Sequence, residues 1–187
     1  MRGIKSGIYP HLLFACLLLM MGGCSSSGPV KVQVVAQADA RINRDEQGRP
    51  LSVLVRMYQL KSSEAFGKLT FDVIASGRDE GELLGKDLIA RSEMTLVPGG
   101  RVDLQDVLQE STQYVGVVAF LRRPDPNYWR VLVDAREVRR HGLSLKLSDC
   151  YLRVVEPDSI LLPGQPAMPT GVCPVLSAGR SGLGVAR

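Results

Sequence analysis

The strongest constraint on the fold is a set of short segments in which apolar and polar residues alternate. From Val30 to Ile42, every second residue is Val, Ala or Ile, and most residues between them are polar or charged. Alternate side chains point to opposite faces of a β-strand, so this pattern predicts a strand with one buried face. The leucines at alternate positions from Leu143 to Leu147 predict another strand, which we expect to continue through Cys150 to Val155.

Further strands are expected in short segments bounded by Gly, Pro and Asn. Leu51–Leu60 has apolar residues on both faces and should lie centrally, and the very apolar run Gln113–Leu121 should be a core strand. The others are expected at Ala90–Val97, Arg101–Leu108 and Trp129–Val133. About seven or eight short strands separated by regular turns predict a mainly β, two-sheet sandwich, and we expect one such domain over residues 30–175.

The sequence period changes between the second and third expected strands. Four apolar residues from Phe66 to Ile74 fall at helical spacing, and Asp79, three residues before Glu82, can cap a second helix. We therefore expect a helical insertion of two short helices over about residues 62–88.

The first 23 residues have the three parts of a secretory signal peptide: basic Arg2 and Lys5, an apolar run, and Gly22-Gly23 before Cys24. The apolar run has only about ten residues, whereas a membrane-spanning helix needs about 20. Residues 21–24 resemble the lipobox of bacterial lipoproteins, which implies lipidation of Cys24 and a lipidated tether over residues 24–29. The alternative is an ordinary signal peptide, with Cys24 free or in a disulfide. A serine at position 25 resembles the address of outer-membrane lipoproteins.

Charge and composition argue against a nucleic-acid-binding protein. Removal of Arg2 and Lys5 leaves 21 of the 23 basic residues against 19 acidic residues, and only 5% of the residues are aromatic. Clustered cations and stacking aromatic side chains are what nucleic-acid binding requires. A cofactor is not expected either, and neither is a small-molecule substrate.

Two cysteines, Cys150 and Cys173, are left after the signal peptide and Cys24. In an oxidising compartment they predict one disulfide, and the alternative is two unpaired, buried thiols. A zinc site is not expected because two cysteines and the distant His141 do not supply four ligands at a recognised spacing.

Several motifs along the chain together resemble one protein family. In order, they are Asn43, Gly48 and Pro50, the strand from Val55 to Lys61, Phe66, Pro98-Gly99, the run from Tyr114 to Phe120, and Trp129-Arg130. They are similar to the TssJ (SciN-type) outer-membrane lipoproteins of type VI secretion systems. The resemblance implies a transthyretin-like β-sandwich that is tethered to the outer membrane and faces the periplasm. It also implies that the protein binds the periplasmic carboxy-terminal region of the inner-membrane protein TssM.

In that family the loop between the first two strands is implicated in TssM binding. The corresponding residues here are Asn43, Arg44, Asp45, Glu46, Gln47, Gly48, Arg49 and Pro50. Their four charged side chains, expected to be exposed, could steer a partner and fix its register. The alternative is a solvated hairpin loop without a partner.

The sequence also bears on other functions. Catalysis is not expected, because His141 is predicted to lie in a turn beside Arg139 and Arg140, without a nucleophile motif. The aromatic residues Tyr58, Phe120 and Trp129 are expected in the core rather than at an interface. A periplasmic ligand-binding or generic envelope-assembly lipoprotein is the alternative function. The tail over residues 176–187 has no period and is expected to be disordered.

Overall fold

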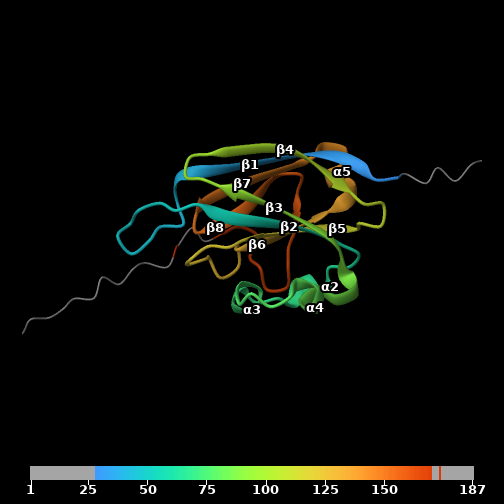
Figure 1. The fold of residues 1–187 in the computed structure, drawn as a ribbon, viewed down its shortest axis with the longest axis horizontal. Coiled ribbons are helices and arrows are strands. Elements are labelled where there is room, and N and C mark those ends of the chain that lie inside the picture. Colours follow the sequence, from blue (N-terminus) through green and yellow to red (C-terminus); the bar gives the residue numbers. More distant parts are fainter. Residues whose placement is uncertain (1–27, 170–172, 174–187) are drawn as a thin grey trace, which may run out of the picture.

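The computed structural model describes residues 28–169 and residue 173. The predicted signal peptide, Cys24 with most of its tether, and the tail after residue 175 lie outside the described residues. Two β-sheets pack face to face around a hydrophobic core (Figure 1). The predicted mainly β, two-sheet sandwich is therefore confirmed. Within the described residues, no helix is long and apolar enough to cross a membrane.

Each sheet combines strands from distant parts of the sequence. The first has the order β4-β1-β7-β8, with bounds Arg101–Leu108, Val30–Ile42, Leu143–Asp149 and Tyr151–Glu156. The second has the order β3-β2-β5-β6-β9, with bounds Leu88–Leu96, Val53–Leu60, Tyr114–Ala119, Arg130–Asp134 and Ser159–Ile160. Among these strands, β1 and β7 pair in parallel and the other neighbours pair antiparallel. As predicted, β2 is not an edge strand.

Strand β1 has the bounds that the alternating pattern predicted. Its even-numbered residues from Val32 to Ala38 are buried between the sheets, but Ala40 is exposed, contrary to the expected alternation. The pairing of β1 with β7 shifts register between Ala38 and Ile42. Between these two pairs β1 has two more residues than β7, so Ala40 faces outward and Ile42 is again fully buried.

The prediction of one strand from Leu143 to Val155 is wrong, because the chain reverses direction near Asp149. Asp149 has a φ of 37°, and β8 folds back antiparallel on β7. A left-handed conformation is more accessible to Asp than to most residues, since its short polar side chain tolerates that region. The apolar residues on both sides of the turn concealed it in the sequence pattern.

The predicted helical insertion is present but consists of more elements than expected. Helices α2 (Glu64–Lys68), α3 (Phe71–Ala75) and α4 (Glu80–Leu84) are followed by a 3₁₀ turn, η1 (Gly85–Asp87). The first predicted helix is divided because Leu69 is extended, with φ −60° and ψ 144°. The predicted cap at Asp79 is confirmed, since its carboxylate accepts a hydrogen bond from the Glu82 amide at 3.0 Å. The insertion covers the outer face of the second sheet (Figure 1).

A further helix, α5 (Ala135–His141), was not predicted from the sequence. His141 is its last residue, and its expected position in a turn is therefore wrong. The Asp134 carboxylate caps the helix by accepting a hydrogen bond from the Arg136 amide at 2.8 Å. Gly142 ends it with a φ of 76°, and a side chain there would meet the Gln33 carbonyl oxygen at 2.7 Å.

The sandwich has a second hydrophobic cluster besides the core between the sheets. It lies under the helical insertion and contains Tyr58, Phe66, Leu84 and Trp129. The predicted core positions of Tyr58 and Trp129 are confirmed, whereas Phe120 is only partly buried and packs against this cluster.

Candidate partner-binding loop

The loop formed by residues 43–50 joins β1 to β2 at one tip of the molecule (the cyan loop in Figure 1). The described chain begins at the opposite end, where β1 starts (Figure 1). Strand β1 has 13 residues, and at about 3.3 Å per residue it spans about 43 Å. The loop and the amino-terminal end of the domain are therefore separated by roughly the length of the sandwich.

Asn43 anchors the base of this loop and is 8% exposed. Its side-chain amide donates to the Ser52 carbonyl at 2.9 Å, and its side-chain oxygen accepts from the Arg122 amide at 2.7 Å. The Asn43 amide donates to the Asp149 carbonyl at 2.8 Å. Asn43 thus connects three segments at this tip: loop 43–50, the β5–β6 loop and the β7–β8 turn.

Asp45 organises the interior of the loop. One carboxylate oxygen accepts from the amides of Gln47 and Arg49 at 2.9 and 2.8 Å, and the other from Arg49 Nε at 2.7 Å. Burial raises the Asp45 pKa, but these hydrogen bonds outweigh burial and hold the pKa below its ordinary value. The prediction that Asp45 is exposed is wrong, because the residue is 7% exposed and its carboxylate points into the loop.

The loop backbone is also closed by its own hydrogen bonds. Gly48, at a φ of 77°, donates to the Asp45 carbonyl at 3.1 Å, and Asp45 donates to the Arg49 carbonyl at 2.9 Å. The Leu51 amide donates to the Ile42 carbonyl at 3.2 Å, which joins the two ends of the loop. A loop held by this many internal bonds loses little conformational entropy when a partner binds.

The remaining loop side chains are available to a partner. The exposed residues are Arg44, Glu46, Gln47, Gly48, Arg49 and Pro50. Arg44 forms a two-point ion pair with the Asp149 carboxylate, at 2.6 and 3.0 Å, which raises the Arg44 pKa. The Arg49 side chain is 74% exposed even though its Nε binds Asp45. The tip therefore presents charges of both signs in fixed positions.

Sequence reasoning missed the residues of the neighbouring β5–β6 loop at this tip. Arg123 lies 4.0 Å from the Glu46 carboxylate. The buried Asp125 carboxylate accepts from the amides of Asn127 and Tyr128, and the Asp125 amide donates to the Cys150 carbonyl at 2.8 Å. The sequence Asp-Pro-Asn at 125–127 is a turn signal that could have indicated the structure of this β5–β6 loop.

The structure joins the two predicted disulfide cysteines, Cys150 and Cys173, with a Cα–Cα separation of 5.6 Å. The bond lies at the same end of the sandwich as loop 43–50, because Cys150 directly follows Asp149. His141 is at the opposite end, where its Nε2 lies 3.6 Å from the Glu137 carboxylate.

A two-sheet sandwich of this kind is the fold of a type VI secretion lipoprotein of known structure, TssJ1 from Pseudomonas aeruginosa. That structure has a TM-score of 0.59 and 26% identity, over 70% of this chain and 98% of the other. Residues 30–150 match the family of type VI secretion lipoproteins (VasD, EvfM, TssJ, VC_A0113), and the chain belongs to this family.

Chains from two further type VI structures are also similar. One belongs to a structure described as "Type VI membrane complex", with a TM-score of 0.60, 30% identity, and coverage of 68% of this chain and 98% of the other. The second belongs to a structure described as "T6SS protein TssM C-terminal domain (869-1107) from EAEC". Its TM-score is 0.59 and its identity 28%, and the match covers 68% of this chain and 98% of the other. No curated protein matches the chain.

Proposed function

We propose that this protein is an outer-membrane lipoprotein of the type VI trans-envelope complex. In this proposal it binds the periplasmic carboxy-terminal region of a TssM-like inner-membrane protein through loop 43–50. Membership of the lipoprotein family supports the first part. The second part is supported by similar chains in structures described as a type VI membrane complex and as a TssM carboxy-terminal domain.

The proposed anchor is acyl lipid on Cys24, four residues before Gly28, where the described chain begins. Two or three acyl chains hold a protein on a bilayer far more firmly than one chain does. Because β1 leads from this end to loop 43–50, the domain can place the loop about 43 Å from its membrane-attached end. That arrangement suits a protein that contacts a partner from the opposite membrane.

The observation that carries the proposed interface is the combination of exposed charges with a rigid loop backbone. Arg44, Glu46 and Arg49 face solvent, whereas Asn43 and Asp45 are used internally. Charges held in fixed positions favour association and select among partners, at little entropic cost.

The interface is tested with the full lipidated chain in nanodiscs and the periplasmic region of the TssM-like protein, by biolayer interferometry. The triple variant Arg44→Glu, Glu46→Lys, Arg49→Glu should bind at least about tenfold more weakly, because complementary charges become repulsive. It removes the ion pairs of Arg44 with Asp149 and of Arg49 with Asp45, but keeps the hydrogen bonds of Asn43 and the bonds from backbone amides to Asp45. Unchanged affinity would show that the loop is not the interface.

A matched control carries the same charge changes at the opposite end of the sandwich. The variant Arg136→Glu, Glu137→Lys, Arg140→Glu alters three α5 residues that are at least partly exposed, and changes the net charge by the same amount. It should bind like the wild type, and an equal loss would attribute the effect to net charge rather than to the loop.

The anchor is tested separately. Mass spectrometry of the native amino terminus should show acylated Cys24, and Cys24→Ser should move the protein from the outer-membrane fraction to the soluble periplasmic fraction. An unmodified Cys24 thiol would contradict the proposed location.

A further inference from the structure

A second charged feature lies on the outer face of the second sheet, where the segment between α3 and α4 meets β2 and β3. It is an open hollow of about 420 Å³. The residues that matter for its chemistry are Arg56, Arg78, Asp79, Glu80, Arg91 and Phe120. We call it the arginine hollow.

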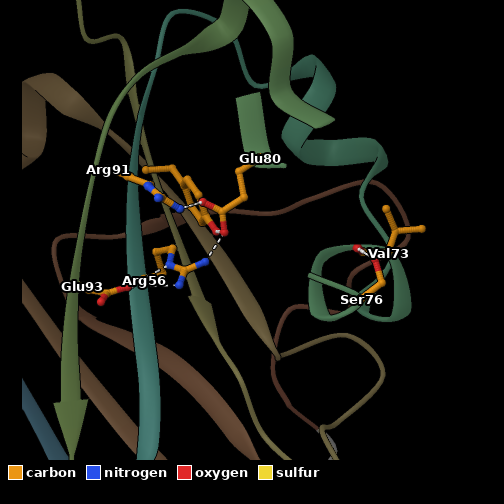
Figure 2. A network of polar contacts seen from close by, with 7 residues as sticks. Arg56, Val73, Ser76, Glu80, Arg91 and Glu93 are labelled. Atoms are coloured by element: carbon orange, nitrogen blue, oxygen red, sulfur yellow. Dashed lines mark hydrogen bonds and ion pairs between the residues drawn. The ribbon is translucent and has the colours of Figure 1, made fainter. Parts of the chain in front are cut away.

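A buried carboxylate, Glu80, forms the base of the hollow, and its side chain is 5% exposed (Figure 2). One oxygen accepts from Arg56 and from the Tyr58 hydroxyl, the latter at 2.8 Å, and the other oxygen accepts from Arg91 at 2.7 Å. Burial raises the Glu80 pKa, but these three donors outweigh burial and lower it. Glu80 is thus ionised, and both of its oxygens are engaged by donors of the protein itself.

The guanidinium group of Arg56 is also fully engaged by other residues of the protein. It binds Glu80 with one nitrogen and Glu93 with two others, at 3.0 and 3.3 Å (Figure 2). Its guanidinium also lies over the Phe120 ring, 5.1 Å from the ring centre. Arg56 therefore holds the floor of the hollow together and has little capacity for a ligand.

The arginines at the rim of the hollow have hydrogen-bond donors that no residue of the described chain uses. Arg91 is 58% exposed and uses one guanidinium nitrogen for Glu80. Arg78 is exposed and makes no side-chain hydrogen bond or ion pair to another residue of the described chain. Asp79 uses one carboxylate oxygen to cap α4. The hollow thus has unused guanidinium donors on Arg78 and Arg91 beside an aromatic ring, whereas the charge of Arg56 is balanced by Glu80 and Glu93.

We propose that the arginine hollow receives an acidic side chain of a protein partner. The carboxylate would lie between Arg78 and Arg91, and its aliphatic stem against Phe120. Guanidinium groups bind carboxylates through paired, charge-assisted hydrogen bonds, so this ligand satisfies the unused donors of Arg78 and Arg91.

The identity of that partner rests on the proposed function. Arg56 is six residues after Pro50, so its Cα atom, at the floor of the hollow, lies at most about 20 Å from the end of loop 43–50. A standard protein interface buries about 800 Å² on each side, which is about 30 Å across. One partner can therefore cover both the loop and the arginine hollow.

The test measures binding of the full lipidated chain in nanodiscs to the TssM-like periplasmic region. Arg78→Glu should weaken binding about fivefold to tenfold and Arg78→Lys much less, since the lysine keeps the charge but not the paired donors. Arg153→Glu is the matched control, because it reverses an exposed arginine on β8 of the other sheet. Among the described residues Arg78 makes no side-chain hydrogen bond or ion pair, so weaker binding of Arg78→Glu would not result from a lost internal bond. Wild-type affinity of Arg78→Glu would overturn the proposal.

The proposals for the loop and the hollow can fail independently. Weakening by Arg78→Glu alone supports the arginine hollow and overturns the loop, and weakening by the loop triple variant alone does the reverse. If the wild type does not bind the TssM-like region, NMR titration with tetraglutamate still tests the hollow. Shifts of the Nε–H signals of Arg78 and Arg91, absent in Arg78→Glu, would support it, and unshifted signals would overturn it.

Discussion

The two hydrophobic cores of this protein are built from different kinds of residue. Among the described residues, the core between the sheets contains only aliphatic side chains and methionine. The outer core, between the second sheet and the helical insertion, is rich in aromatic residues and encloses two charged ones, Glu80 and Arg130. Hydrogen bonds between the sheets, such as those of Gln59 with Val107 and of Ser92 with Asp106, lie outside the apolar core, whereas buried charged side chains attach the short helices.

The physical reason is that the helices of the insertion are five residues long. The first and last four residues of any helix leave backbone groups without partners, so a helix of this length has almost no internally satisfied backbone. Arg130 supplies donors to the carbonyls of Phe66 and Gly67 near the end of α2. Glu80, at the start of α4, is tied to β2 and β3 through Arg56 and Arg91.

The largest effect is expected in the core between the sheets. Leu147→Ala should lower the free energy of unfolding by about 3 kcal/mol, because it removes a fully buried side chain and leaves a cavity. Urea denaturation followed by circular dichroism measures this. Val107→Ala, at an exposed position of β4, is the control and should change stability little. Equal losses for both variants would mean that burial between the sheets does not dominate stability.

A smaller effect is expected from Arg130 in the outer core. Its guanidinium contacts the rings of Trp129 and Phe66, at 4.6 and 5.6 Å from their centres, and burial lowers its pKa to about 10. Arg130→Lys should cost about 2 kcal/mol, because a single ammonium group cannot serve two carbonyls and stack as well. Arg101→Lys, on the exposed edge strand β4, is the control for the loss of guanidinium itself. An unchanged free energy of unfolding for Arg130→Lys would show that α2 does not depend on this attachment.

The smallest effect at neutral pH is expected for Glu80→Gln, which should lower the free energy of unfolding by about 1 kcal/mol. Its sharper signature is in acid. The folded-state pKa of Glu80 lies below its ordinary value of 4.5, so the stability due to the carboxylate is present above pH 4.5 and is lost as the pH falls further. Below pH 4.5, the free energy of unfolding should therefore fall less steeply with decreasing pH for Glu80→Gln than for the wild type, as measured by urea denaturation at each pH. Glu64→Gln removes an exposed ion pair, and its free energy of unfolding should depend on pH almost as steeply as that of the wild type.

Much of the fold could be predicted from local patterns. Strand β1 has the predicted bounds, and Asp79 caps a helix, because both depend on residues close in sequence. Helix α5 was missed because its seven residues, Ala-Arg-Glu-Val-Arg-Arg-His, have too few apolar positions to show a helical period. The β7–β8 turn was missed because it has neither Gly nor Pro to mark it.

In the candidate loop, too, some features follow from the local sequence and others depend on tertiary contacts. Its position, charge and turn residues are properties of the sequence. That Asp45 is internal and Arg49 external is a tertiary result, since it depends on which hydrogen bonds the closed loop allows. The contacts of Asn43 with Arg122 and Asp149 join residues about 80 and 106 positions apart, which no local pattern can indicate.

By itself, the sequence determined the β-sandwich class, the helical insertion and the family resemblance, because alternation, helical spacing and short motifs depend on neighbouring residues. Only the tertiary structure decided which charges are buried and which remain exposed. A charge can be buried only where partners from other strands satisfy it, as Arg56, Tyr58 and Arg91 do for Glu80. Those partners come from β2 and β3, and only the pairing of these strands brings them to one carboxylate.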